Sequence, residues 1–320
     1  MRRFFSNRKV QVILNGGLAA CVLAATIVGG QRFARGGWPL HHADPVLVTG
    51  AALLFLIAYA FKAWGWQRLF AADERPGASA LAFAGGAACV GGVALPGRLD
   101  DALRIAVVKR FPGVKSGLGA VALSLVVLGL LDNAALAPLA SVAAADADSW
   151  TVRAGFAVVA VAGVLAAIVV ASLPTIASRP FVMRFRMGRW LASRGHCNRR
   201  AAAAFFFISI SWSLRGTAVF LLLEALSLRG SFPLALAFLC ASAASAALPI
   251  APAGAATQAG AGAAILIASG VHTTDAIAFA VAAQGLVICT GLVVMFCIAA
   301  WQMVLRLRRH HRLAPAVALP

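Results

Sequence analysis

The sequence predicts an all-α polytopic membrane protein, and three observations support this class. First, 62% of the 320 residues are hydrophobic and only 12% are charged, whereas soluble domains average about 45–50% apolar and about 25% charged residues. Second, several apolar runs reach the roughly 20 residues that a helix needs to cross a bilayer. Third, Lys and Arg gather in alternate intervals between these runs, as expected when basic loops stay in the cytoplasm.

The apolar runs define the expected elements in chain order. The first follows the basic start MRRFFSNRKV, and no A-x-A-like site closes it, so we expect an uncleaved helix rather than a signal peptide. The runs cover residues 10–30, 46–66, 78–94, 117–140, 151–173, 201–226, 232–249 and 276–304, with a weaker Ala- and Gly-rich run at 253–268. We expect one membrane domain over residues 1–320, with about eight transmembrane helices and two re-entrant hairpins.

The net charge of +18 is interpreted as a topology signal rather than as nucleic-acid binding. If the first run leaves the cytoplasm, Arg68, the 98–115 block, the 179–200 segment and the C-terminal tail are all cytoplasmic. This requires residues 78–110 to enter and leave on the cytoplasmic side as a re-entrant hairpin. We expect a plasma (inner) membrane protein with both termini in the cytoplasm. The Arg-rich segment 174–200 would lie along the inner leaflet and contact anionic headgroups.

Two short motifs recur in the same order in both halves of the chain. Leu95-Pro96 matches Leu248-Pro249, and Gly113-Val114 matches Gly270-Val271. We therefore predict a repeat, 46–140 with its hairpin 78–110 and 201–305 with its hairpin 232–268. The charge pattern predicts that the two hairpins enter the membrane from opposite sides. The repeat would then be inverted, as in many transporters. The alternative is chance recurrence in a chain rich in Ala, Gly, Leu and Val.

The hairpin breaks are predicted from proline and glycine. Pro96 and Gly97 interrupt the first hairpin, and Pro249, Pro252 and Gly254 interrupt the second, because proline breaks a helix and glycine permits unusual backbone conformations. Non-helical backbone is tolerated at membrane depth only where protein or a water-filled cavity surrounds it. The alternative is that the small residues of the second hairpin mark ordinary helix packing.

The returning arm of the first hairpin carries candidate headgroup ligands. Asp101 and Arg104 are three residues apart, so they share a helix face. Arg98 and Arg104 could form planar, bidentate contacts with a phosphate. The alternative is an amphipathic arm at the cytoplasmic interface, where its arginines reach lipid headgroups.

Further candidates lie inside apolar runs, where ionisable residues are costly and therefore mark functional sites. Asp132 has no basic residue within one helical turn, so its partner must come from another helix, and Arg215 is a candidate for that ion pair. Gln258 is a polar side chain of the second hairpin. The alternative for Asp132 and Arg215 is that both are polar residues of helix packing.

Catalytic and metal chemistry find no support in the sequence. The six cysteines lack C-x-x-C or Cys/His spacing, and all but Cys197 lie in apolar runs, which is typical of small buried residues. No Walker loop, zinc spacing or Ser/His/Asp set is visible. We expect no cofactor, no metal and no enzymatic activity.

The motifs at the two hairpins resemble those of a known family. LPGRLDDALRIAVVKR resembles the P-x-G-E-x-x-R stretch of the transmembrane, flippase-like region of lysylphosphatidylglycerol synthases. LPIAPAGAATQAGAGAAILIASGV is similar to that family's P-x-P-G-G-x-G-x-x-E stretch, which also precedes Gly-Val. The resemblance implies an inverted-repeat domain that translocates lipids or lipid-linked intermediates. By position, it assigns the family's Glu to Asp101, its Arg to Arg104 and an Asp to Asp132.

The resemblance also has departures. Ala253 replaces the first Gly of the second motif, Ala259 stands at the position of its carboxylate, and the Glu-Arg pair that often precedes Asp132 is absent from SLVVLG. The similar region does not include the soluble aminoacyl-transferring domain, so we expect that this stand-alone relative makes no lysyl-lipid.

Three hypotheses for function follow. The first is a flippase for a phospholipid or a polyprenyl-phosphate-linked glycolipid, with the hairpins forming its cavity. The second is a non-transporting partner of a cell-envelope glycosyltransferase or lipid-modifying enzyme. The third, an intramembrane enzyme, lacks a visible nucleophile and base. Expected partners are membrane lipids with anionic headgroups, a second copy of the chain or a glycosyltransferase, and no nucleic acid.

Overall fold

The computed structural model describes residues 43–94, 99–147, 149–177, 179–180, 198–228, 230–246 and 254–313. These ranges are helical apart from the connections between helices, so the all-α class is confirmed for them. The predicted first helix at 10–30, the tips of both hairpins and most of the 174–200 segment lie outside the described residues.

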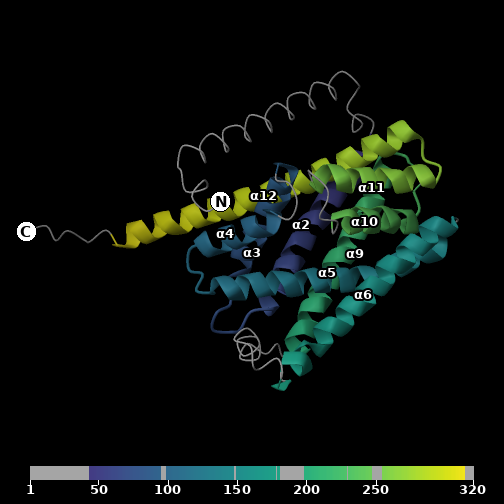
Figure 1. The fold of residues 1–320 in the computed structure, drawn as a ribbon. Coiled ribbons are helices and arrows are strands. Elements are labelled where there is room, and N and C mark those ends of the chain that lie inside the picture. The colour runs from purple at the N-terminus through teal and green to yellow at the C-terminus, as the bar shows by residue number, and fades with distance from the viewer. Residues whose placement is uncertain are drawn as a thin grey trace, which may run out of the picture. The chain divides into compact units, whose positions relative to one another are not determined.

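The helices of the described ranges are shown in Figure 1. They are α2 (Pro45–Arg68), α3 (Ala78–Ala94), α4 (Leu99–Arg110), α5 (Leu118–Asp146), α6 (Trp150–Ala177), α9 (Asn198–Ala225), α10 (Phe232–Ala246), α11 (Gly254–Ala268) and α12 (Thr273–Leu313). Among them α2, α5, α6, α9 and α12 are long and apolar enough to cross a membrane. Helices α3, α10 and α11 are apolar but have 17, 15 and 15 residues, below the roughly 20 of a full span.

Several helices extend beyond the apolar runs that predicted them. Helix α5 continues to Asp146, α6 to Ala177 and α12 to Leu313, whereas the runs end at 140, 173 and 304. The extension of α12 is rich in Arg and Leu, which are good helix formers even where the segment is too polar for the bilayer core. The apolar runs therefore underestimate the length of these helices.

Helices α2 and α9 run antiparallel and pack closely along their length. The N–H of Asp44 donates to the carbonyl of Ala225 at 3.0 Å near one end of the pair. In the middle, the buried Ser211 hydroxyl donates to the carbonyl of Ala58 at 2.8 Å. Gly65 permits the close approach, because a Cβ there would lie 3.1 Å from the Ala204 carbonyl oxygen.

Helices α3 and α4 form a pair whose outer ends are tied together. The Ser116 hydroxyl, just after α4, donates to the carbonyl of Glu74, just before α3. The Lys109 ammonium donates to the carbonyl of Ser116 at 2.9 Å. The rings of Phe83 and Phe111 also meet, with centroids 5.9 Å apart. The chain therefore enters and leaves this pair at the same end.

Helices α10 and α11 form a second pair. The Ser242 hydroxyl of α10 donates to the carbonyl of Gln258 on α11 at 3.0 Å. Gly262 packs directly against the Phe238 ring, where a side chain would collide. Figure 1 shows this pair and the α3–α4 pair on either side of α2.

Each pair is also held against a long helix from the other half of the chain. Helix α3 packs on α12, and α10 packs on α5. The α3–α12 contact is close, since a Cβ at Gly86 would lie 2.7 Å from the Gly291 carbonyl oxygen. Helix α6 packs on α5 and leaves much of its apolar surface exposed.

The two Gly-Val motifs adopt the same backbone conformation. Gly113 follows α4 with φ +83°, and Gly270 follows α11 with φ +86°; in the described ranges these are the glycines with positive φ. This left-handed region is accessible to glycine without the penalty that a Cβ imposes. Each glycine therefore ends the second arm of its pair and turns the chain into the next long helix.

Candidate functional site

The site centres on a carboxylate of α5 that contacts both α2 and α9. Oδ2 of Asp132 lies 2.8 Å from the Lys62 ammonium nitrogen, and each side chain is 21% exposed. Oδ1 of Asp132 accepts a hydrogen bond from the Trp212 indole N–H at 2.9 Å. A charged side chain inside the membrane is costly unless paired, and both oxygens of Asp132 are used here.

Arg215 lies one turn further along α9 and is held by aromatic rings rather than by a carboxylate. Its guanidinium carbon lies 5.2 Å from the centroid of the Trp212 ring and 5.7 Å from that of Tyr59. Within the described ranges its buried Nε has no hydrogen-bond partner. Cation–π contacts are worth about 0.5–2 kcal/mol, so they stabilise the guanidinium but leave its N–H donors available.

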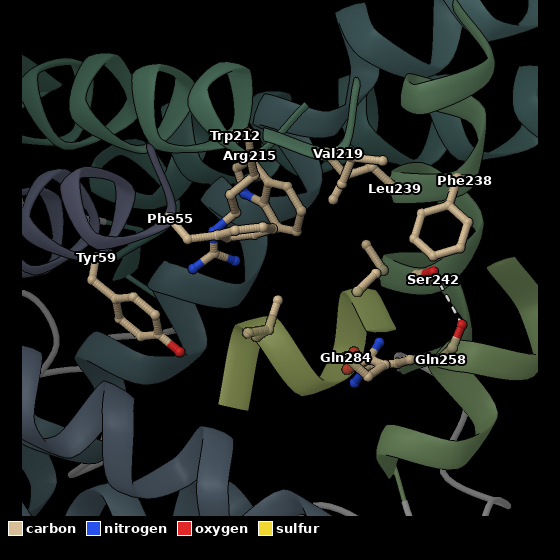
Figure 2. A pocket seen from close by; sticks show the side chains of 13 residues that line it. Phe55, Tyr59, Trp212, Arg215, Val219, Phe238, Leu239, Ser242, Gln258 and Gln284 are labelled. Atoms are coloured by element: carbon tan, nitrogen blue, oxygen red, sulfur yellow. Dashed lines mark hydrogen bonds between the residues drawn. The ribbon is translucent and has the colours of Figure 1, made fainter. Parts of the chain in front are cut away.

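A cavity of about 90 Å³ opens beside Arg215. Figure 2 shows Trp212 and Arg215 extending from one helix toward the part of the cavity lined by Phe55 and Tyr59. The lining comes from α2, α9, α10, α11 and α12, so the second hairpin pair forms one wall. The lining residues are Phe55, Tyr59, Trp212, Arg215, Val219, Phe238, Leu239, Ser242, Ala243, Gln258, Ala283, Gln284 and Val287.

The predicted pair on the first hairpin arm is present and includes a second carboxylate. Arg104 Nη1 lies 2.8 Å from Asp101 Oδ1, and Nη2 lies 3.4 Å from Asp100 Oδ2. Arg104 does not line the cavity.

The remaining predicted site residues are placed as follows. Gln258 lines the cavity from α11, and Gly254 begins that helix. Arg98, Pro96, Gly97, Pro249 and Pro252 lie outside the described residues. In the ranges that the structure describes, no group of three or more His, Cys, Asp or Glu side chains could hold a metal ion.

The membrane setting of this cluster agrees with a comparison against protein families. The family model described as Lysylphosphatidylglycerol synthase TM region matches residues 12–295. The chain belongs to this family. Searches of curated proteins and of solved structures found no match. For this member of the lysylphosphatidylglycerol synthase transmembrane family, the match and the five long apolar helices indicate a membrane-embedded protein.

The expected partner of Asp132 was wrong. In this family member the carboxylate pairs with Lys62, 70 residues away, and not with Arg215. The pairing follows from helix packing, because Lys62 and Trp212 project from two different helices toward α5, while Arg215 projects toward Tyr59.

Sequence reasoning missed Lys62, Tyr59 and Trp212. Lys62 stands inside a long apolar run, so the rule that intramembrane charges mark functional sites applies to it as much as to Asp132. A second signal was also available. Tyr59 and Lys62 are three residues apart, as are Trp212 and Arg215, so each helix carries an aromatic ring and a cation on one face.

Proposed function

We propose that this protein translocates a phospholipid or a polyprenyl-phosphate-linked glycolipid across the plasma (inner) membrane. The observation that carries this proposal is the cavity beside Arg215, which adjoins the Lys62–Asp132 pair and has one wall formed by α10 and α11. A translocator must shelter a polar headgroup within the hydrocarbon layer, and ionisable residues there mark such pathways. In this proposal the protein acts by binding and release, without catalysis.

The arrangement of helices supports an inverted-repeat architecture for this function. Helices α2–α5 and α9–α12 form the two proposed repeats. Three contacts in one set have a counterpart in the other: α3 with α4 and α10 with α11, α2 with α3 and α9 with α10, α3 with α12 and α10 with α5. Transporters with such repeats bind substrate near the membrane midplane, where interrupted helices meet.

A contact between the two ends of the first hairpin pair supports the proposed topology. The bond between Ser116 and Glu74 keeps the entry and exit of the α3–α4 pair together, as a hairpin re-entrant from one side requires. We propose that this side is cytoplasmic, as are both termini, because the basic intervals then share one side.

Transport can be measured in proteoliposomes that hold fluorescent phospholipids in both leaflets. Dithionite destroys the outer-leaflet fluorophores, and a translocator allows it to quench the remainder. We expect quenching beyond the outer leaflet with wild type, and a reduced rate with Asp132→Asn, Asp101→Asn and Arg104→Gln. Asp146→Asn is the matched control, since Asp146 lies exposed at the end of the same helix as Asp132.

Two results would contradict the proposal. If the wild-type protein gives no quenching beyond protein-free liposomes with any phospholipid or polyprenyl-phosphate lipid, translocation is excluded and a non-transporting role beside a glycosyltransferase is favoured. If quenching is present but unchanged in the three variants, lipids move by a route that does not use this site.

A further inference from the structure

We infer that Arg215 forms an anion site for the phosphate group of an amphiphile, and that its free charge arises from an asymmetry between the two repeats. This inference rests on the proposed repeat architecture and deepens the proposed function by assigning the residue that binds the phosphate of the ligand.

Lys62 and Arg215 occupy equivalent positions in the proposed repeats. They are separated by 153 residues, the same offset that relates Leu95-Pro96 to Leu248-Pro249. Tyr59 and Trp212 have the same offset. Both helices therefore present an aromatic ring and, one turn later, a cation.

A contact between the repeats supports the same alignment. Ala58 and Ser211 also differ by 153 residues, and the Ser211 hydroxyl donates to the Ala58 carbonyl at 2.8 Å. When two equivalent residues touch each other, they lie on or near the axis that relates their repeats. Lys62 and Arg215 each follow this contact by one turn, on opposite sides of it.

In the part of the chain that the structure describes, the carboxylate that neutralises Lys62 has no equivalent beside Arg215. Gly113 and Gly270, which precede α5 and α12, are 157 residues apart, and the same offset carries Asp132 to Cys289. Cys289 is exposed and carries no carboxylate. Among the described residues, Lys62 is thus neutralised by a carboxylate whereas Arg215 is not, and the buried Nε of Arg215 has no acceptor there.

The cavity beside Arg215 has the chemistry of an anion site with an apolar approach. Arg215 is the charged residue among the described residues that line it, and Ser242, Gln258 and Gln284 add polar groups. Its volume of about 90 Å³ leaves room for a phosphate group. Arginine binds phosphate through paired, directed hydrogen bonds.

The inference is tested by binding rather than transport. Full-length protein in detergent is titrated with dioctanoyl phosphatidic acid, dioctanoylglycerol and glycerol 3-phosphate, with calorimetry as the readout. We expect wild type to bind the phosphatidic acid at least ten-fold more tightly than the other two. Arg215→Gln should abolish this preference, and Arg215→Lys should retain part of it, since the charge remains without the planar fork.

Two further variants keep the test decisive. Arg153→Gln removes an exposed arginine of α6 and should bind like wild type. Gln258→Glu introduces a carboxylate into the cavity wall, so it should weaken phosphatidic acid binding about ten-fold or more and leave dioctanoylglycerol binding unchanged. This variant tests the site even if Arg215→Gln does not fold.

The outcomes separate this inference from the proposed function. Equal binding of phosphatidic acid and dioctanoylglycerol, or a preference that survives both Arg215→Gln and Gln258→Glu, overturns the anion site. Tight binding of glycerol 3-phosphate assigns the site to a soluble phosphate and overturns the assignment to an amphiphile. If the protein shows the expected binding preference but no transport in the liposome assay, the anion site is supported and the proposed transport function is contradicted.

Discussion

Lys62 and Asp132 form an ion pair of 2.8 Å between α2 and α5, two helices that otherwise touch little. Trp212 of α9 completes the contact by donating to the other carboxylate oxygen. The pair thus joins three membrane helices at one point next to the cavity. The pair fixes the relative positions of these helices. It also contributes to stability, since removing one partner leaves the other charge unpaired.

Asp132→Asn is expected to destabilise the protein by about 1–3 kcal/mol, because the Lys62 ammonium loses the negative charge that neutralises it. Lys62→Gln should have a similar effect. The double variant should cost less than the sum of the single variants, with a coupling of about 0.5–3 kcal/mol. Unfolding in detergent, followed by circular dichroism, measures these values, and strict additivity would show that the pair does not form in solution.

Trp212→Phe is expected to lose the hydrogen bond to the carboxylate, worth about 1.5–3 kcal/mol for a charged acceptor, while the ring that faces Arg215 remains. Trp64→Phe is the matched control, since Trp64 is 43% exposed on α2. Thermal unfolding of both variants gives the comparison. Equal melting temperatures for the two would argue against the Trp212–Asp132 bond.

Gly86→Ala is expected to disturb the packing of the first hairpin pair on α12. The new Cβ would lie 2.7 Å from the Gly291 carbonyl oxygen, and overpacking of this kind costs about 1–3 kcal/mol. Gly92→Ala, in the same helix, meets nothing within 4 Å and should be neutral. The transport rate and the free energy of unfolding should both fall for Gly86→Ala alone. An equal loss in both variants would point to helix flexibility instead.

Gly113→Ala and Gly270→Ala are expected to cost about 1–2 kcal/mol each, because both positions require a left-handed backbone. Similar penalties are expected, since the φ angles are +83° and +86°. Gly117→Ala provides the control, because Gly117 has φ −66°, which alanine adopts freely. Chemical denaturation measures all three, and a harmless Gly113→Ala would mean that the turn rearranges.

Cysteine labelling tests the orientation of α5. In a background without native cysteines, Lys115→Cys and Asp146→Cys place exposed thiols at its two ends. We expect an impermeant maleimide applied to intact cells to label Asp146→Cys and to reach Lys115→Cys only after permeabilisation. Labelling of Lys115→Cys from outside would contradict both the cytoplasmic hairpin and the inverted repeat.

The class of the fold and the family could be predicted from sequence because both depend on local information. Hydropathy identifies membrane helices, and the motifs around Leu95 and Leu248 identify the family. The Asp101–Arg104 pair also follows from spacing within one helix. Each of these features is fixed by residues close together in the chain.

The cavity and the Lys62–Asp132 pair could not be predicted in the same way. They depend on how six helices pack, and the paired residues are 70 positions apart. Lys62 was overlooked because its neighbours are strongly apolar, although that surrounding is what makes its charge informative. The repeat offset would have connected Lys62 with Arg215, yet it could not reveal which of the two cations the carboxylate neutralises.

The bond between Ser211 and Ala58 has a consequence for motion. It is buried where α2 and α9 cross, away from water that could replace it, and the nearby Gly65 leaves no room for sliding. Separation of the two helices would therefore be costly, whereas a small rotation about this point keeps the bond intact. We therefore expect any movement of one half of the protein against the other to be a small rotation about this crossing, rather than a separation of the two helices.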